Sequence, residues 1–434
     1  MAELAEAIRT GDMVAGGESG LKLNEPFPER YAKARDSLYA DKPQAPAATA
    51  TAGAATVLTL DSGRNCRRDG HVATAYRKAR SEATASALHG VDRRSTDRLR
   101  NAGRRQGPGM LSGHVNRLLT QVDDGTQNRL FHADNVNSQT RFRFTGSQEV
   151  MPGLTAGINW EVGYTSNPSS GINMSTRSVD ATFNERHTEA YLFGSWGKVS
   201  FGQGDGAANG GMEVDLSGTS VINYSSSTDI GGNFAFRQGT AFGPTIASTI
   251  SNLDFESRYD RVRYDSPKFG PVALSGSFGT KGNNDVYELA AWADTPLAGG
   301  KLAGALGWSR EAKGGTSGNE DTVGGSLSWL AANGFNVTVA AGQSEDDNPA
   351  VAKKKCGYGK LGYINGKHAV SVGYGRGEDF AVAGDEADSF GVGYVYAAQK
   401  WIEFYAGAKQ HKLDRAGSNF DNITFVTVGT RLKF

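Results

Sequence analysis

Arginines at every second position mark two short stretches of the sequence. Residues 141–144 read Arg-Phe-Arg-Phe and residues 261–264 read Arg-Val-Arg-Tyr. Because successive side chains of a β-strand point to opposite faces, each stretch places its arginines on one face and its apolar residues on the other. Charged side chains repeated on one face of a strand are costly to place anywhere but in water. The pattern predicts two strands whose basic faces meet water, and the arginines on these faces are Arg141, Arg143, Arg261 and Arg263.

Acidic residues occur in the connection 205–257, which precedes the second arginine stretch. This connection is about 50 residues long, and structureless connections of more than about 15 residues are uncommon unless they have a function. It contains Glu213, Asp215 and Asp229. If these acids faced the arginine-bearing strands, together with Arg186, across a narrow gap, the opposed charges would order water and favour polar over apolar solutes. We therefore predict an electrostatic site rather than a covalent one.

No catalytic or metal-binding arrangement accompanies these charges. His187, His368 and His411 fall in separate segments without a serine or cysteine partner. The Gly-Gln-Gly run at 202–204 precedes no predicted helix, so it is not a phosphate-binding loop. The two cysteines show neither CxxC spacing nor a histidine partner, and they are Cys66 and Cys356. The sequence therefore predicts no enzyme, no metal and no cofactor.

Segments of alternating polarity recur from about residue 111 to the end of the chain. In the clearest, 154–165, apolar residues occupy every second position over a length that would cross a bilayer when tilted. The last segment, 423–434, ends on Phe434 and has one mostly apolar face. Pairing of this strand with the first would close the sheet into a barrel without a free edge. By itself the segment fits an edge strand of a soluble sandwich better.

Short and long connections alternate between these segments. Turns at 151–153 and 365–367 are short, whereas 123–138, 205–257 and 280–285 are interpreted as longer polar loops. Segregation of short turns from long loops is typical of an outer-membrane barrel and is not expected of a sandwich, and the segments number about 16. The mean hydropathy is −0.45. Because no apolar run approaches the roughly 20 residues of a membrane helix, the chain could cross a membrane only as a β-barrel.

Residues 1–110 differ from the remainder. The stretch 22–55 is rich in Ala, Pro and Thr, and 64–105 is rich in arginine with few aromatic residues. A disordered basic segment, a nucleic-acid-binding tail and the translation of a shifted reading frame all remain open, although no folded nucleic-acid motif is present and no nucleic-acid partner is expected. The first residues carry charges where a secretion signal would have its apolar core, so no signal peptide is recognisable.

Several of these stretches, taken together, resemble the general diffusion porins of Gram-negative outer membranes. They are 140–146 followed by the Pro152-Gly153 turn, 186–202 with its Trp-Gly-Lys turn, 261–267 and the terminal Phe434. The resemblance covers 111–434. One departure is that 210–215 lacks the Pro-Glu-Phe-Gly-Gly run found in many porins of this type.

The resemblance implies an all-β protein of the outer membrane. The fold would be a transmembrane antiparallel barrel of about 16 strands, with the third loop, 205–257, folded inward. It would be a homotrimer in contact with lipid and lipopolysaccharide, and small hydrophilic solutes and ions would diffuse through it passively. The constriction residues would be Arg141, Arg143, Arg186, Arg261, Arg263, Glu213, Asp215 and Asp229. Phe434 would be the barrel-closing C-terminal residue.

Two other functions are compatible with the strands. A substrate-specific outer-membrane channel would share the fold but should show an aromatic track for sugars or a dense basic cluster for phosphate. A secreted soluble β-protein, such as an adhesin, would need no membrane. For the channel itself, a small excess of acidic residues in 111–434 favours cations weakly.

Overall fold

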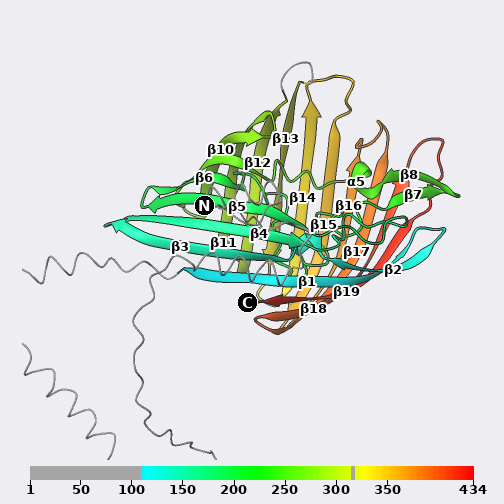
Figure 1. Cartoon of the computed structure of the whole chain (residues 1–434), viewed down its shortest axis with the longest axis horizontal. Helices are drawn as coiled ribbons and strands as arrows, with labels where there is room; N and C mark the ends of the chain where they lie inside the picture. The colour runs from blue at the N-terminus through cyan, green and yellow to red at the C-terminus, as the bar shows by residue number, and fades with distance from the viewer. Residues whose placement is uncertain (1–108, 314–317) are drawn as a thin grey trace, which may run out of the picture. The chain divides into compact units, whose positions relative to one another are not determined.

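The computed structural model describes residues 109–313 and 318–434, and most of them belong to one antiparallel sheet (Figure 1). The expected segment 1–110 therefore lies almost wholly outside the described residues, and its separation from the barrel stays a prediction. The strands of the sheet are β1 (Met110–Asp123), β2 (Asn128–Asp134), β3 (Arg141–Met151), β4 (Leu154–Thr165), β5 (Thr182–Gly194), β6 (Gly197–Asp205), β9 (Arg258–Asp265), β10 (Val272–Lys281), β11 (Asn284–Leu297), β12 (Gly300–Ala312), β13 (Asn319–Leu330), β14 (Phe335–Asp346), β15 (Lys354–Asn365), β16 (His368–Glu378), β17 (Glu386–Gln399), β18 (Ile402–Asp414) and β19 (Ile423–Lys433).

The sheet closes on itself. The last strand, β19, pairs with β1 from His114↔Lys433 to Asp123↔Thr424. The other edge of β1 is covered by β2 and β3, and each later strand pairs with the next, with β6 joined directly to β9. The predicted antiparallel barrel, closed by the C-terminal strand, is confirmed. Closure removes the free edges that an open sheet would leave.

β2 and β3 are two halves of one barrel strand. β2 pairs with Arg117 to Asp123 of β1, β3 pairs with Met110 to His114 of the same strand, and residues 135–140 between them leave the sheet. The 17 named strands of the sheet thus fill 16 barrel positions, as predicted. The interruption contains the short 3-10 helix η1 (Val136–Ser138).

Two of the predicted long loops are wrong. Residues 124–127 form a tight turn in which Asp124 Oδ1 accepts hydrogen bonds from the backbone N–H groups of Thr126 and Gln127. The strand that follows was missed because two of its three apolar residues, Phe131 and Ala133, face the barrel interior instead of the outside. The predicted loop 280–285 is likewise only a turn between the paired residues Lys281 and Asn284.

The outer face of the barrel is apolar and the inner face is polar. Leu306 is 71% exposed on the outside, as are Val339 and Trp401 to a smaller degree, whereas the inward-facing Ser328 and Asn336 are fully buried. An exposed apolar band of this kind is what a lipid-facing barrel surface requires. Among the described residues, no helix has the length and apolar character needed to span a membrane.

The connection between β6 and β9 contains further structure. It carries the hairpin of β7 (Ala235–Gln238) and β8 (Ala241–Thr245) and the single-turn helix α5 (Ile246–Thr249). Figure 1 shows these elements in green on the side of β16 and β17. Part of this connection packs in a buried apolar cluster with residues of β1, β2 and β17–β19.

Candidate electrostatic site on the inner wall

A β-bulge shapes the inner wall at Arg186. The ladder between β4 and β5 pairs Glu161 with His187 and then Val162 with Glu185, so Arg186 has no partner opposite it. In a regular strand, neighbouring residues point to opposite faces, and Arg186 would point outward because His187 is buried inside. The extra residue of a bulge re-aims a side chain, and here the Arg186 side chain reaches Glu161 inside the barrel.

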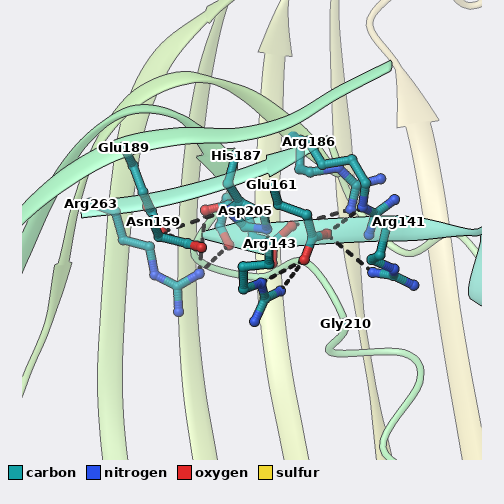
Figure 2. Close-up of polar contacts among 12 residues, drawn as sticks. Arg141, Arg143, Asn159, Glu161, Arg186, His187, Glu189, Asp205, Gly210 and Arg263 are labelled. Carbon is teal, nitrogen blue, oxygen red and sulfur yellow. Dashed lines mark hydrogen bonds and ion pairs between the residues drawn. The ribbon is translucent and has the colours of Figure 1, made fainter. Parts of the chain in front are cut away.

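Three arginines converge on the carboxylate of Glu161 (Figure 2). Arg186 Nε lies 2.5 Å from Oε1, Arg141 Nη1 lies 3.2 Å from the same oxygen, and Arg143 Nε lies 2.6 Å from Oε2. The Glu161 side chain is 1% exposed, while that of Arg143 is 42% exposed. One buried carboxylate thus holds three guanidinium groups, and their outer surfaces face the lumen. Of the five arginines predicted to line the constriction, the structure brings Arg141, Arg143 and Arg186 together. Their role in a constriction stays a prediction.

Arg258 and Asp205 extend the basic group toward β6 and β9. Arg258 Nη1 lies 3.3 Å from Asp205 Oδ1, and both side chains are partly exposed. Asp205 Oδ2 also lies 3.7 Å from His187 Nε2. The sequence prediction missed Arg258, although it occupies the position three residues before Arg261 and begins the same strand.

Arg261 and Arg263 lie apart from this group. Arg261 is almost fully buried, and its guanidinium is paired with Glu189, which also accepts a hydrogen bond from Asn159. Arg263 pairs with Asp265 at 2.8 Å and donates to the backbone oxygen of Gly206 at 2.6 Å. Both arginines face inward as predicted, but their charge is compensated locally and they brace the start of the connection to β9.

The predicted acids of the connection form no ion pair with the arginines. Asp215 pairs with Lys360 of β15 at 2.6 Å, and both side chains are buried. Asp229 accepts a hydrogen bond from Tyr224, and burial raises the pKa of the Asp229 carboxyl. Glu213 accepts a hydrogen bond from Asn252 Nδ2 at 2.9 Å. The sequence alone could not identify the partners of these acids, because the folded path of the connection brings each acid to its partner.

Burial also dominates the titration of Glu213. The loss of hydration, with the nearby charge of Asp229, raises the pKa of Glu213 to about 7. The charges of Arg258 and Asp205 act on the same carboxyl. Among these contributions, the charge of Arg258 favours the ionised form of Glu213.

Comparison with known proteins identifies the family. The sequence model described as Gram-negative porin matches residues 110–416. The chain belongs to the Gram-negative porin family. The porin is an outer-membrane protein, in agreement with the expected localisation.

Solved structures of outer-membrane proteins share its fold. The anion-selective porin from Comamonas acidovorans is 18% identical to this porin, with a TM-score of 0.55 over 75% of this chain and 99% of that chain. The outer-membrane-expressed OmpT of Vibrio cholerae is 13% identical, with a TM-score of 0.50 over 75% of this chain and 97% of that chain. Outer membrane protein U of Vibrio parahaemolyticus is 27% identical over 119 residues, which are 27% of this chain and 32% of that protein.

Two further predictions concern the ends of the porin barrel and its cysteines. Phe434 follows β19 directly and exchanges backbone hydrogen bonds of 3.0 Å with Gly113 of β1, so the last residue takes part in barrel closure.

Cys356 is a free thiol on β15 that donates to the backbone oxygen of Asn252, whereas Cys66 lies outside the described residues. Within residues 109–313 and 318–434, no group of His, Cys, Asp and Glu side chains has the arrangement of a metal site.

Proposed function

We propose that this porin is a water-filled channel for the passive diffusion of small hydrophilic solutes and ions, and that it is not an enzyme. The family assignment and the closed 16-strand barrel support the channel. The soluble adhesin alternative loses its basis, because the family is that of membrane barrels. A barrel of this size would be wide if it were empty, so its selectivity depends on what narrows the lumen.

The narrow point lies, in this proposal, at the arginine group of Arg141, Arg143, Arg186 and Arg258. The single observation that carries the proposal is the convergence of Arg141, Arg143 and Arg186 on the buried Glu161. A carboxylate that is 1% exposed orients the guanidinium groups but contributes little surface of its own to the lumen. The connection 206–257 provides the opposite side of the passage.

We infer that the channel prefers anions. Four guanidinium groups surround Glu161 and Asp205, so the local charge is positive, while Asp215 and Asp229 have partners elsewhere. Local charge in a narrow, poorly screened passage outweighs charge in outer loops, where salt screens interactions beyond about 10 Å. This inference reverses the weak cation preference predicted from composition. The anion-selective porin from Comamonas acidovorans has a similar fold.

The partners follow from the same proposal. Lipid and lipopolysaccharide would contact the apolar outer face, and small polar solutes would occupy the lumen. A homotrimer is proposed because one similar structure is the trimer form of OmpT, with a TM-score of 0.50 over 76% of this chain.

Swelling of proteoliposomes tests the channel directly. Vesicles with the full-length protein, placed in isotonic solutions of sugars of increasing size, should swell at rates that fall steeply with solute size. Vesicles with heat-denatured protein are the control. Swelling no faster than in the control, from protein that shows a folded barrel by its heat-dependent gel mobility, would overturn the proposed function.

A further inference from the structure

The connection 206–257 follows the inner wall of the barrel strand by strand. Its first contacts are the N–H of Ala207 with Ser277 Oγ on β10 at 2.8 Å and the N–H of Ala208 with Glu288 on β11 at 2.9 Å. The next are Val214 N to Ser326 Oγ (2.9 Å), Leu216 N to Ser328 Oγ (2.9 Å), Thr219 Oγ1 to Ser371 Oγ (2.7 Å) and Asn223 Nδ2 to Gly391 O (3.3 Å). Residues 207–223 therefore cover the wall from β10 to β17.

The returning part of the connection is tied to the outgoing part. Asp254 accepts hydrogen bonds from the N–H groups of Gly210 at 2.7 Å and Met212 at 2.9 Å. Gly206 N donates to the backbone oxygen of Ser257 at 2.9 Å, so the two ends of the connection meet. These hydrogen bonds between its outgoing and returning parts make the connection a folded layer on the inner wall and not a free loop.

The middle of the connection is held by the interruption of the second barrel strand. Asn135 Nδ2 donates to the backbone oxygen of Val221 at 2.9 Å and lies 3.0 Å from the hydroxyl of Tyr405. That hydroxyl donates to Asn116 Oδ1 at 2.8 Å. Asn116, Asn135 and Tyr405 are all buried. Next to them, Asn137 Nδ2 donates to the backbone oxygen of Ser220 at 2.5 Å.

An apolar cluster continues this contact toward β1, β2 and β19. The ring of Phe234 lies edge-on to Phe131 of β2 at 5.2 Å and to Phe425 of β19 at 5.3 Å. Ile172 from the loop after β4 and Ile246 from α5 are fully buried in the same cluster. Buried aromatic contacts of this kind are found in protein cores and are not expected in a water-filled lumen.

The strands that carry Arg141, Arg143 and Arg186 are left uncovered. Among the described residues, no hydrogen bond joins 206–257 to β3, β4 or β5. Ser147 of β3 pairs with Gly157 on the inward-facing side of the ladder and is exposed. In contrast, Thr427 of β19 faces inward but is 3% exposed, because Ile222 and Ile230 of the connection line the same small cavity.

We propose that residues 219–250 form a fixed plug that closes the side of the lumen bounded by β1, β2 and β17–β19. The interruption at 135–138 is the docking element for this plug, and Asn135 and Tyr405 are its positioning residues. Solutes then pass only along the wall formed by β3, β4 and β5. The proposal rests on the proposed channel function but adds the route and the residues that fix it.

Cysteine accessibility tests the route. The parent background is Cys66→Ser/Cys356→Ser. In it, Ser147→Cys and Thr427→Cys are compared for reaction with a membrane-impermeant, negatively charged methanethiosulfonate reagent, by mass shift and by single-channel conductance. We expect Ser147→Cys to react within minutes and its conductance to fall, whereas Thr427→Cys should react at least tenfold more slowly with unchanged conductance. Adding Asn135→Ala or Tyr405→Phe to Thr427→Cys should raise the reaction rate of the Thr427→Cys thiol several-fold. The matched control, Asn333→Ala in an exposed turn, should leave that rate unchanged.

The outcomes separate the two proposals. Equal reaction of Ser147→Cys and Thr427→Cys, with conductance reduced in both, would overturn the plug and leave the channel intact. An unchanged rate for Thr427→Cys in both the Asn135 and Tyr405 variants would overturn the docking role of these residues. Absence of any conductance in the parent background, in protein with a folded barrel, would instead contradict the channel function itself.

Discussion

Arg186 reaches Glu161 from the one position of β5 that a bulge leaves unpaired. The ion pair between Arg186 Nε and Glu161 Oε1, at 2.5 Å, joins the neighbouring strands β5 and β4 on the inner wall. A regular ladder would direct Arg186 toward lipid, where an arginine costs a few kcal/mol near mid-depth. The bulge thus turns a destabilising residue into part of the electrostatic site.

Replacement of the central carboxylate should strengthen the anion preference. Glu161→Gln keeps the size of the side chain but removes one negative charge from among Arg141, Arg143 and Arg186. At partly screened distances of this order, one charge is worth about 1 kcal/mol, or about fivefold in the permeability ratio. Reversal potentials of Glu161→Gln and wild type in a salt gradient would measure the change. Glu345→Gln, an exposed acid at the end of β14 that is paired with Lys353, should leave the ratio unchanged. An unaltered ratio in Glu161→Gln would exclude Glu161 from the passage.

The two faces of the barrel should differ in their tolerance of charge. Val339→Arg places a guanidinium on the lipid-facing side and should destabilise the folded barrel by about 2–4 kcal/mol. Ser147→Arg, on the exposed inner wall, should change stability by less than about 1 kcal/mol. Urea titrations of refolding into vesicles measure both. Similar losses for the two variants would contradict the assignment of inner and outer faces.

The buried ion pair between Lys360 and Asp215 should be essential for the position of the connection. Their side chains are 0% and 4% exposed, so loss of one partner leaves an uncompensated buried charge. Lys360→Met should therefore cost about 3–5 kcal/mol, while the double variant Lys360→Met/Asp215→Leu should recover most of that loss. Thermal unfolding followed by gel mobility would report the difference. Additive losses in the double variant would show that the two residues do not act as a pair.

Glu213 should make the selectivity depend on pH. Its pKa of about 7 means that the carboxyl is mostly neutral at pH 5.5 and mostly ionised at pH 8. Ionisation adds a negative charge within range of Arg258, so the anion preference should weaken as the pH rises through 7. In Glu213→Gln that part of the pH dependence should vanish, as judged from reversal potentials at the two pH values. A wild-type preference that strengthens with pH would have the wrong sign for this mechanism.

The barrel could be predicted from the sequence because its signal is local. Alternation of side chains, short turns such as Pro152-Gly153 and the aromatic terminus each act over a few residues, and Gly153 adopts the positive φ of 78° that such a turn requires. β2 escaped prediction because Phe131 and Ala133 pack inward on a cluster that the connection creates. The partners of Asp215 and Asp229 were missed for the same reason, since the course of the connection is set by contacts distant in the sequence.

The group around Glu161 was predicted in part. The alternation of Arg141 and Arg143 with phenylalanine placed them on the inner face, which the structure bears out. Alternation did not single out Glu161 as the partner of these arginines, because a lone acid on the polar face of a strand cannot be told from any other polar residue there. The bulge at Arg186 has no sequence signature of its own, so the inward position of this arginine rested on the family resemblance.

The reversal potential of the purified full-length protein in a planar bilayer, under a tenfold KCl gradient, tests the central claim most directly. The arginine group predicts a potential whose sign indicates chloride preference. It also predicts that Arg143→Gln, which removes the most exposed guanidinium at Glu161, moves the potential toward zero. Lys412→Gln, an exposed lysine paired with Asp414 at the end of β18, should leave the potential unchanged. A cation-selective potential, or one that is identical in wild type and Arg143→Gln, would contradict an arginine-lined passage.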